Sequence, residues 1–313
     1  ATFMCCWCIW VDNVSRETMM KEKVTSCPVC GCDQVNKVIT TVDYSTTKES
    51  FDITKCLVCT HLFTNPRIKE DEIAPYYDNP NYISHTDDQA TLFSKVYQRL
   101  RRINLSRKTS YVSSVTPGHG RVLDYGCGTG QFLEVLGINN FKSEGVEINP
   151  GAREKASQYG TVHESIDKVK PGVQTITMWH VMEHVYDPKT LLKEFKLRLL
   201  PGGHVLIAVP NPESHDAKHY EKYWAAWDVP IHAHHFTKRS MIKMMEDAGF
   251  QHLDITPMNM DSYYISLLSE QYKSASDSKS IKNWLNAILQ GFKSNYRGKK
   301  DNTSSLIYTF RLA

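Results

Sequence analysis

The feature that most constrains the fold is a glycine-rich loop set between an apolar run and a segment of helical periodicity. Residues 121–135 read RVLDYGCGTGQFLEV, with three glycines within positions 126 to 130. This order of patterns predicts a buried strand, a tight turn and then a helix. In an open α/β sheet, such a turn lies at the carboxyl end of a strand, where ligands bind.

Beyond this loop, segments with the patterns of strands and helices alternate to the end of the chain. Alternation of this kind predicts an α/β fold, a doubly wound, mostly parallel sheet with helices on both faces. A polar, partly helical insertion interrupts the pattern around residues 270–300. The strands are expected at 121–126, 143–148, 160–165, 173–179, 204–210, 252–258 and 304–312.

The loop departs from two common phosphate-binding patterns. No Gly-Lys-Ser/Thr follows its glycines, and Gln131 stands where the dinucleotide fingerprint requires glycine or alanine. Asp124, two residues before the first glycine, would repel a pyrophosphate but suits a ligand with an ammonium and a sulfonium. Glu147, 23 residues further on, ends the second strand and is placed to accept hydrogen bonds from ribose hydroxyls. These features indicate S-adenosylmethionine.

The motifs VLDYGCGTG, GVEIN, TITMWHVMEHVYDP and LRLLPGGHVLIAVPN resemble those of the class I S-adenosylmethionine-dependent methyltransferases. The resemblance covers about residues 115–313. It is nearest to a bacterial subgroup related to the ubiquinone-pathway O-methyltransferases, in which WDVPIHAHHFT follows the fifth strand and a zinc ribbon often precedes the domain. It implies a seven-stranded Rossmann-like sheet of order 3-2-1-4-5-7-6, with the last strand antiparallel. The insertion before SSLIYTFRL departs from the family pattern, on the substrate side.

On this interpretation the cofactor contacts the first three strand ends and the fourth-strand segment. Cys127, inside the loop, is expected to be a small spacer under the cofactor, and Trp179 to lie beside the sulfonium. The full set of expected cofactor-binding residues is Asp124, Gly126, Cys127, Gly128, Gly130, Phe132, Glu147, Ile148, Ser165 and Trp179.

Two histidine-rich motifs follow the fourth and fifth strands. HVMEH, residues 180–184, matches an inverted zinc-protease motif, but the strand before it puts His180 at a strand end and not within a helix. Neutral imidazole is well matched to proton abstraction near pH 7. We expect His180, His232 or His235 to be the catalytic base. Positioning of the acceptor contributes more to the rate enhancement than the base does. Loss of the base should therefore slow the enzyme without abolishing turnover.

Two Cys-x-x-Cys pairs near the amino terminus predict a zinc ribbon. Cys27 and Cys30 are separated by 25 residues from Cys56 and Cys59, with a β-like interval between them. Four thiolates satisfy tetrahedral zinc and leave no open position, so the metal is expected to be structural. Cys32 is expected to be a bystander. Nine clustered cysteines also favour metal or free thiols over disulfides, and hence a cytoplasmic setting.

The 313 residues allow one large domain and a small module. We expect a tail of uncertain origin at 1–19, a zinc ribbon at 20–65, a linker or lid with a helix at 66–114, and a methyltransferase domain at 115–313. The tail lacks the basic flank of a secretory signal. YYDNPNYISH, at 76–85, is either a lid over the cofactor or a packed linker.

The predicted function is methyl transfer to a small-molecule or carbohydrate acceptor, at oxygen. The alternative is an RNA methyltransferase that binds its substrate through the ribbon and the basic run KVYQRLRRINLSRK. Against it, residues 27–59 carry a net charge of −1, whereas a phosphate-binding ribbon should be basic. A cofactor-binding scaffold without activity is a third class. A net charge of +3 and the lack of a run of about 18 apolar residues predict neither a nucleic-acid nor a membrane partner. Oligomeric state stays open.

Overall fold

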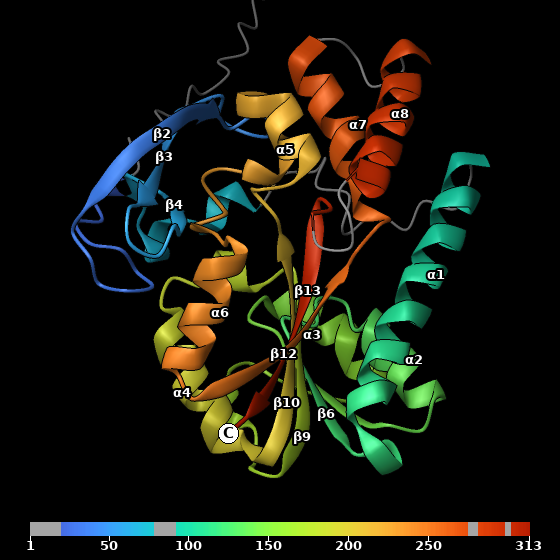
Figure 1. Ribbon diagram of the computed structural model, residues 1–313. Helices are drawn as coiled ribbons and strands as arrows, with labels where there is room; N and C mark the ends of the chain where they lie inside the picture. Colours follow the sequence, from blue (N-terminus) through green and yellow to red (C-terminus); the bar gives the residue numbers. More distant parts are fainter. Residues whose placement is uncertain (1–19, 78–91, 275–280, 298–301) are drawn as a thin grey trace, which may run out of the picture.

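The computed structural model describes residues 20–77, 92–274, 281–297 and 302–313. Its main feature is a seven-stranded sheet of order β12-β13-β10-β9-β6-β7-β8 (Figure 1). In chain order this is 3-2-1-4-5-7-6, and β13 runs antiparallel to both of its neighbours, as the resemblance implies. The strands are β6 (Arg121–Tyr125), β7 (Lys142–Val146), β8 (Thr161–His163), β9 (Val173–Trp179), β10 (Leu199–Pro210), β12 (Phe250–Pro257) and β13 (Ser305–Leu312).

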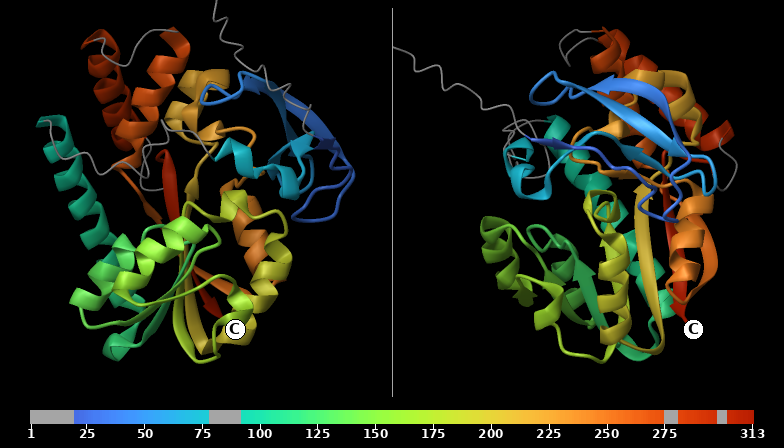
Figure 2. Two further views of the ribbon diagram at one scale, coloured as in Figure 1. Left: turned by 180° about the vertical axis from the view of Figure 1, so that it is seen from behind. Right: turned by 90° about the vertical axis from the view of Figure 1, so that its left-hand side faces the viewer.

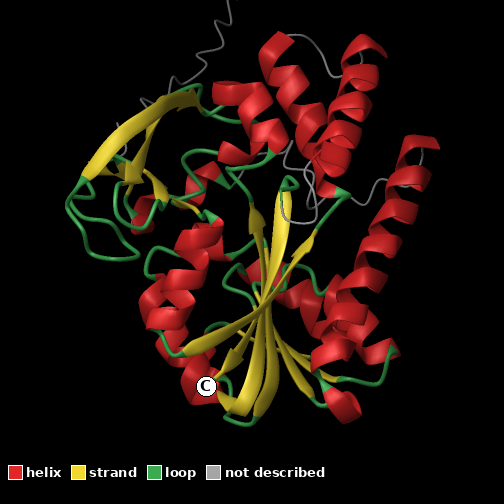
Figure 3. Ribbon diagram, in the orientation of Figure 1, coloured by secondary structure: helices red, strands yellow, loops and turns green. Residues whose placement is uncertain are grey.

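Helices cover both faces of this sheet, because successive side chains of a strand point to opposite sides. Leu123 of β6 packs with the side that includes Phe195, and the adjacent Val122 packs with the side that includes Phe132. Figure 3 shows helices flanking the strands on both sides. The helices are α1 (Leu92–Val115), α2 (Gln131–Ile138), α3 (Pro150–Ala156), α4 (Pro188–Arg198), α5 (His215–Tyr220), α6 (Lys238–Asp247), α7 (Asp261–Ser274) and α8 (Ile281–Arg297).

Local sequence fixes where several helices begin. Asn149 accepts a hydrogen bond from Ala152 N at 3.0 Å and is followed by proline, which suits the first turn of α3. Asp187 and Thr237 cap α4 and α6 in the same way. Short 3-10 helices fill the connections: η1 (Glu70–Glu72), η2 (Ala74–Tyr76), η4 (Pro117–His119), η5 (Ser157–Tyr159), η6 (Ile166–Lys168), η7 (Met182–His184), η8 (Glu221–Tyr223) and η9 (Ala225–Trp227).

The amino-terminal part forms a second, antiparallel sheet of order β11-β4-β3-β2. It contains β2 (Val35–Val42), β3 (Ser50–Cys56) and β4 (Leu62–Thr64), and a short pair joins β1 (Lys21–Glu22) to β5 (Arg67–Ile68). Its edge strand β11 (His234–His235) comes from the segment after β10, so two distant parts of the chain share one sheet. Figure 2 shows this sheet beside the carboxyl ends of the main strands.

The cysteine-bearing turns share a core with the main sheet. Cys27 and Cys59 belong to the same buried cluster as Met241 and Met244 of α6, and Thr60 Oγ1 lies 2.9 Å from Thr237 Oγ1. The ribbon is thus packed on α6.

Two regions differ in detail from the expectations. β10 begins at Leu199 and includes the Pro-Gly-Gly turn, with an irregularity in its pairing to β9 between Leu199 and His204. The insertion is wholly helical where it is described, and its first helix begins at Asp261, about nine residues before the polar stretch suggests. The tail at 1–19 and most of YYDNPNYISH lie outside the described residues. Among the helices described, none is both long and apolar enough to cross a membrane.

Candidate functional site

The glycine loop adopts a backbone that side chains disfavour. Gly126, Gly128 and Gly130 have φ values of +74°, +56° and +82°. A Cβ on Gly126 would lie 2.5 Å from a methyl carbon of Val181, so that position has no room for a side chain. A Cβ on Gly128 would meet nothing within 4 Å. The loop is therefore closed towards η7 and open at Gly128.

Asp124 is the second-last residue of β6, beside this loop, and is 3% exposed. Thr177 Oγ1 of β9 donates a hydrogen bond to its Oδ1 at 2.7 Å. Burial raises the pKa of Asp124 to about 6, although the hydrogen bond from Thr177 and the charge of Lys108 oppose the shift. The carboxyl therefore ionises just below neutral pH. An apolar-walled carboxylate of this kind attracts a cationic ligand more strongly than a solvated one.

Glu147 lies one residue after β7 and holds the loop from the other side. Its Oε2 accepts a hydrogen bond from Gly128 N at 2.8 Å, and its Oε1 accepts one from Asn149 N at 2.8 Å. Each carboxylate oxygen keeps further acceptor capacity. The half-buried Glu147 is thus fixed in orientation and able to receive hydroxyl donors.

An aromatic wall follows the fourth strand. Trp179, the last residue of β9, makes an edge contact with Phe132, with ring centroids 5.5 Å apart. Lys108 Nζ of α1 lies 4.7 Å from the centroid of the indole. Trp179 Nε1 is buried without a hydrogen-bond partner among the described residues. A buried donor without a partner is a group that a ligand can satisfy.

The other expected cofactor residues lie around the same strand ends, in different environments. Cys127 is 8% exposed, and burial raises the pKa of its thiol, so the side chain is neutral. Phe132 is buried within α2, beneath the loop. Ile148 is 78% exposed, and Ser165 follows β8, where its hydroxyl donates to Asp167.

His180 follows β9 directly, with a φ of +59°. Its Nε2 lies 2.9 Å from Asp261 Oδ2, and its Nδ1 lies 3.3 Å from Glu183 Oε1. Burial alone would lower the pKa of His180, but the hydrogen bond to Asp261 and the charge of Glu183 raise it to about 10. The imidazole is therefore protonated at neutral pH. An imidazolium cannot accept a proton, which is a departure from the expectation that His180 is a candidate base.

Glu183, His184 and His232 form a second group next to His180. Their potential ligand atoms all lie within 4.8 Å of one another. Glu183 is 1% exposed; its Oε1 forms the ion pair with His180 Nδ1 at 3.3 Å, while its Oε2 has no hydrogen-bond partner among the described residues. A buried carboxylate of this kind is costly unless something pairs with it.

Both histidines of this group form a hydrogen bond through Nδ1 to a backbone carbonyl. His184 Nδ1 lies 3.0 Å from Ile231 O, and His232 Nδ1 lies 3.0 Å from Ala226 O. Because a carbonyl only accepts, the Nδ1 atoms are assigned the protons, and each Nε2 has a free lone pair. Burial lowers the pKa of both imidazoles. His232 is thus neutral, with Nε2 able to accept a proton.

His235 faces the ribbon. Its Nε2 lies 3.3 Å from Thr64 Oγ1, whose hydrogen is donated to His232 O at 2.6 Å, so Nε2 is the donor to Thr64. Burial lowers the pKa of His235 to about 3. With its Nε2 proton donated to Thr64, His235 links β11 to β4, and its Nδ1 is the nitrogen that keeps a lone pair.

Two acids of this site escaped the sequence analysis. Glu183 lay in a motif examined only for protease chemistry, although an acid three residues after a strand-end histidine was a usable signal. Asp261 reaches His180 from α7, 81 positions along the chain, and no local pattern indicates that pairing.

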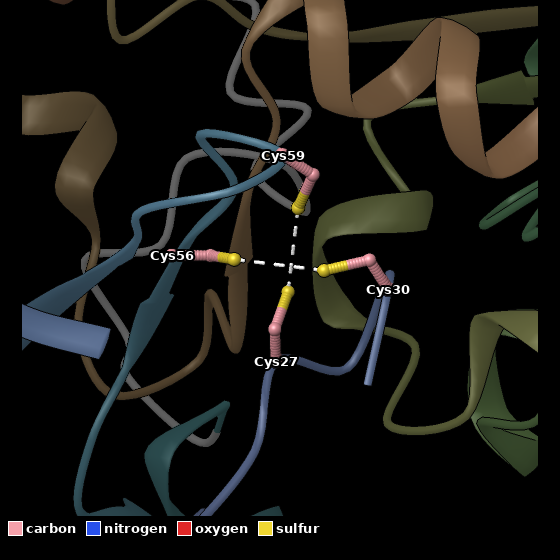
Figure 4. Close-up of side chains that lie close together, drawn as sticks. All are labelled: Cys27, Cys30, Cys56 and Cys59. Carbon is pink, nitrogen blue, oxygen red and sulfur yellow. Dashed lines mark hydrogen bonds between the residues drawn. The ribbon is translucent and has the colours of Figure 1, made fainter. Parts of the chain in front are cut away.

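The four cysteines of the ribbon point their sulfurs at one centre (Figure 4). The Sγ atoms of Cys27 and Cys59 are 3.5 Å apart, as are those of Cys30 and Cys56. Tetrahedral zinc with Zn–S bonds of about 2.3 Å requires sulfurs about 3.8 Å apart, close to the spacing found. The donor set and geometry therefore fit a zinc ion.

Each cysteine pair lies on a turn with a left-handed residue after it. Gly31 follows Cys30 with a φ of +77°, and Thr60 follows Cys59 with a φ of +64°. Cys32 stands outside the cluster, where its sulfur accepts a hydrogen bond from Gln34 N at 3.3 Å.

Comparison with known proteins gives the family. A family model described as a methyltransferase domain matches residues 97–255. Two ubiquinone biosynthesis O-methyltransferases are similar in sequence. That of Alkalilimnicola ehrlichii is 28% identical over 30% of this chain and 44% of the relative's length. That of Vibrio atlanticus is 25% identical over 52% of this chain and 77% of the relative.

Solved structures share the fold. A geranyl diphosphate C-methyltransferase from Streptomyces coelicolor, in complex with Mg²⁺, geranyl diphosphate and S-adenosylhomocysteine, superposes with a TM-score of 0.50 at 15% identity, covering 73% of this chain and 88% of that one. A geranyl diphosphate methyltransferase in complex with S-adenosylmethionine gives 0.50 at 14% identity, covering 73% and 93%. This chain belongs to the class I S-adenosylmethionine-dependent methyltransferases and is related to the ubiquinone-pathway O-methyltransferases.

Proposed function

We propose that the protein transfers a methyl group from S-adenosylmethionine to an oxygen of a small-molecule or carbohydrate acceptor. The observation that carries the proposal is the pair of carboxylates, Asp124 and Glu147, on either side of a loop without a lysine. The names of the relatives, which are O-methyltransferases, support oxygen as the atom methylated.

The chain's residues divide the binding of S-adenosylmethionine between them. Asp124 lies where the cationic amino-acid part would sit, and Glu147 would receive the ribose hydroxyls. Gly128 leaves room for the ligand to approach the backbone, and Trp179, packed on Phe132, would form the wall beside the methyl group. When bound, S-adenosylmethionine supplies a methyl group already activated by its sulfonium.

His232 is our candidate for the proton acceptor, in place of His180 and His235. The acceptor's hydroxyl would give its proton to His232 Nε2 as its oxygen attacks the methyl carbon. The C–S bond breaks, and its electron pair stays on sulfur, giving the neutral thioether. Glu183 lies within reach of the resulting imidazolium and would stabilise its charge. Asp228 Oδ2, 3.9 Å from His232 Nε2, would also stabilise this imidazolium.

His180 would act as a fixed positive charge. Protonated and held by Asp261, it is suited to orient the acceptor's oxygen. The pKa of His180, raised by Asp261 and Glu183, and the pKa of His232, lowered by burial, suit these two different roles.

The experiment begins with an acceptor screen that uses radiolabelled S-adenosylmethionine and a panel of phenols, sugars and RNA. The proposal expects labelling of a hydroxyl compound. Exclusive labelling of RNA would support the alternative, and tight cofactor binding with no labelling would support a scaffold. With an acceptor in hand, His232→Asn should lower kcat by about 10²–10⁴-fold without changing the cofactor's Kd. His204→Asn, on β10, is the matched control.

We further propose that Cys27, Cys30, Cys56 and Cys59 hold one structural zinc ion, in a ribbon at 20–65 joined by residues 66–114 to the methyltransferase domain at 115–313. The sulfur geometry supports zinc. Cysteines that hold zinc instead of forming disulfides would also support the expectation of a cytoplasmic protein.

A further inference from the structure

Asp228 is an acid beside His232 whose carboxylate receives no hydrogen bond. It follows η9 with a left-handed backbone, at a φ of +35°, and its side chain is 23% exposed. In the part of the chain that the structure describes, no N–H or O–H donates to this carboxylate, and His232 Nε2 lies 3.9 Å from its Oδ2. A partly buried carboxylate in such surroundings lacks the partner that would offset its loss of water.

Glu183 is a second acid beside the same histidine. It is 1% exposed, and its Oε2 has no hydrogen-bond partner among the described residues, whereas its Oε1 pairs with His180 Nδ1 at 3.3 Å. A carboxylate oxygen of Glu183 lies within 4.8 Å of a ring nitrogen of His232, which Asp228 also approaches. Two carboxylates with unused acceptor capacity therefore lie next to one histidine, and one of them is almost completely buried.

The charges around Asp228 are negative. Burial is the largest cause that raises its pKa to about 7, and the charges of Asp43 and Glu183 add to the shift. Asp43 is fixed in the turn of the ribbon after β2, where its two carboxylate oxygens accept five hydrogen bonds from residues 45–47. Carboxylates brought together in this way repel one another, so a ligand with positive charge would relieve the repulsion.

Tyrosine rings from three elements accompany these acids. Tyr77 follows η2, and its hydroxyl lies 3.2 Å from His184 Nδ1. Tyr272 of α7 stacks on Tyr44 of the ribbon turn, with ring centroids 4.6 Å apart. Burial raises the pKa of Tyr77 and of Tyr272, and the charge of Asp228 adds to both shifts, so both phenols lie within electrostatic range of the acid. The faces of aromatic rings attract cations, as carboxylates do.

We propose that the methyl acceptor carries a cationic amino group in addition to its hydroxyl, and that Asp228 and Glu183 bind this ammonium. An amino sugar, or a phenol with an aminoalkyl chain, belongs to this class. The inference rests on the proposed function, because the hydroxyl that reacts and the histidine that takes its proton are those of the preceding section. The ammonium is unchanged by the reaction: it is held by the acids while the hydroxyl oxygen receives the methyl group.

A divalent metal ion fits these residues less well than an ammonium. The imidazolium of His180, 3.3 Å from Glu183, would repel two positive charges more strongly than one. A metal bound to His232 would also occupy the Nε2 lone pair that has to accept the proton of the hydroxyl. The tyrosine rings favour an organic cation as well, since they attract it through their faces.

The test extends the acceptor panel with matched pairs of hydroxyl compounds that differ in the amine. Tyramine is compared with para-ethylphenol, and glucosamine with N-acetylglucosamine, using the whole chain and radiolabelled S-adenosylmethionine. The amine of a pair should be methylated at oxygen with a kcat/KM about 10–100-fold above that of its neutral partner, which is the contribution of a hydrogen bond between charged groups.

Asp228→Asn separates binding of the amine from a role in folding or in catalysis. Asparagine tolerates a left-handed backbone as aspartate does, so the variant should fold. It should lose the preference for the amine, mainly through KM. A structural defect, or weaker stabilisation of the His232 imidazolium, would instead slow both members of a pair by the same factor and keep the preference. Glu221→Gln, which removes an exposed acid of the same loop, is the control and should also keep it.

Equal kcat/KM values for an amine and its neutral partner in the parent chain would overturn the inference and leave oxygen methylation in place. Label on the nitrogen would overturn it too, because the amine would then be the group that reacts. So would a second metal ion per chain, found by elemental analysis and lost in Asp228→Asn, since the acids would then hold a metal. If the chain binds S-adenosylmethionine but labels no hydroxyl compound, the proposed function fails, and this inference fails with it.

Discussion

The Nε2 atom of His180 lies 2.9 Å from Oδ2 of Asp261, so the residue that follows β9 is paired with the first residue of α7. The insertion helix thereby reaches the same strand end as the glycine loop. His180 gains a pKa of about 10 from this pair and from Glu183, in spite of its burial. The cofactor side of the site thus holds a fixed cation beside the neutral histidines.

Replacement of Asp261 should show how the His180–Asp261 pair makes the stability of the fold depend on pH. A histidine whose pKa rises on folding contributes stability that is complete below its unfolded pKa, about 6.5, and is lost as pH rises through its folded value, about 10. Asp261→Asn should therefore lower the melting temperature most near pH 6, and less at pH 9. Asp254→Asn, on an exposed part of β12, should show no such trend.

NMR titration of His180 gives an independent check. The parent imidazole should remain protonated through pH 8, whereas in Asp261→Asn it should titrate at a lower pH. A parent imidazole that titrates near 6.5 would contradict the assignment of His180 as a fixed cation.

The affinity for S-adenosylmethionine should depend on the charge of Asp124. Because burial raises the pKa of this carboxyl to about 6, lowering the pH from 7 to 5 should weaken binding as the charge is lost. Calorimetry of Asp124→Asn should show weaker binding at pH 7 and a flatter dependence on pH. An affinity that is the same for both proteins at pH 7 would exclude Asp124 from the cationic contact.

The glycine loop offers a matched pair of substitutions. Gly126→Ala forces a side chain onto a φ of +74° and against Val181, and should destabilise the chain by about 1–3 kcal/mol and abolish cofactor binding. Gly137→Ala, within α2 and with nothing within 4 Å of its Cβ, should instead stabilise by about 0.4–1 kcal/mol. Denaturant unfolding measures both, and equal effects would contradict the account of the loop.

Zinc removal should unfold the ribbon and disturb the main domain. Binding worth about 10–16 kcal/mol is large against the stability of so small a module. Elemental analysis should give one zinc per chain, reduced in Cys59→Ser and unchanged in Cys32→Ser. Since Cys59 shares a core with Met241 of α6, the melting temperature of the whole chain should fall with the metal. The zinc site would be refuted if the purified parent protein contained no zinc and still unfolded in one sharp thermal transition.

The strands and helices of the main sheet could be predicted because their apolar periodicity is strong and local. The end of β9 at Trp179 and the start of α2 at Gln131 follow directly from such patterns. The pairing of β11 with β4 could not be predicted, because strands of two and three residues carry no periodic signal and come from distant segments. For the same reason the sequence could not distinguish the three candidate histidines. Their environments differ through contacts with distant residues: His235 with Thr64, His180 with Asp261, and His232 with the carbonyl of Ala226.

The measurement that most directly tests the central claim is a structure of the protein crystallised with S-adenosylmethionine, paired with calorimetry against NADH and ATP. The account predicts one S-adenosylmethionine per chain, its ribose hydroxyls on Glu147 and its cationic end towards Asp124. Tighter binding of NADH or ATP, with phosphate oxygens against residues 126–130, would contradict it.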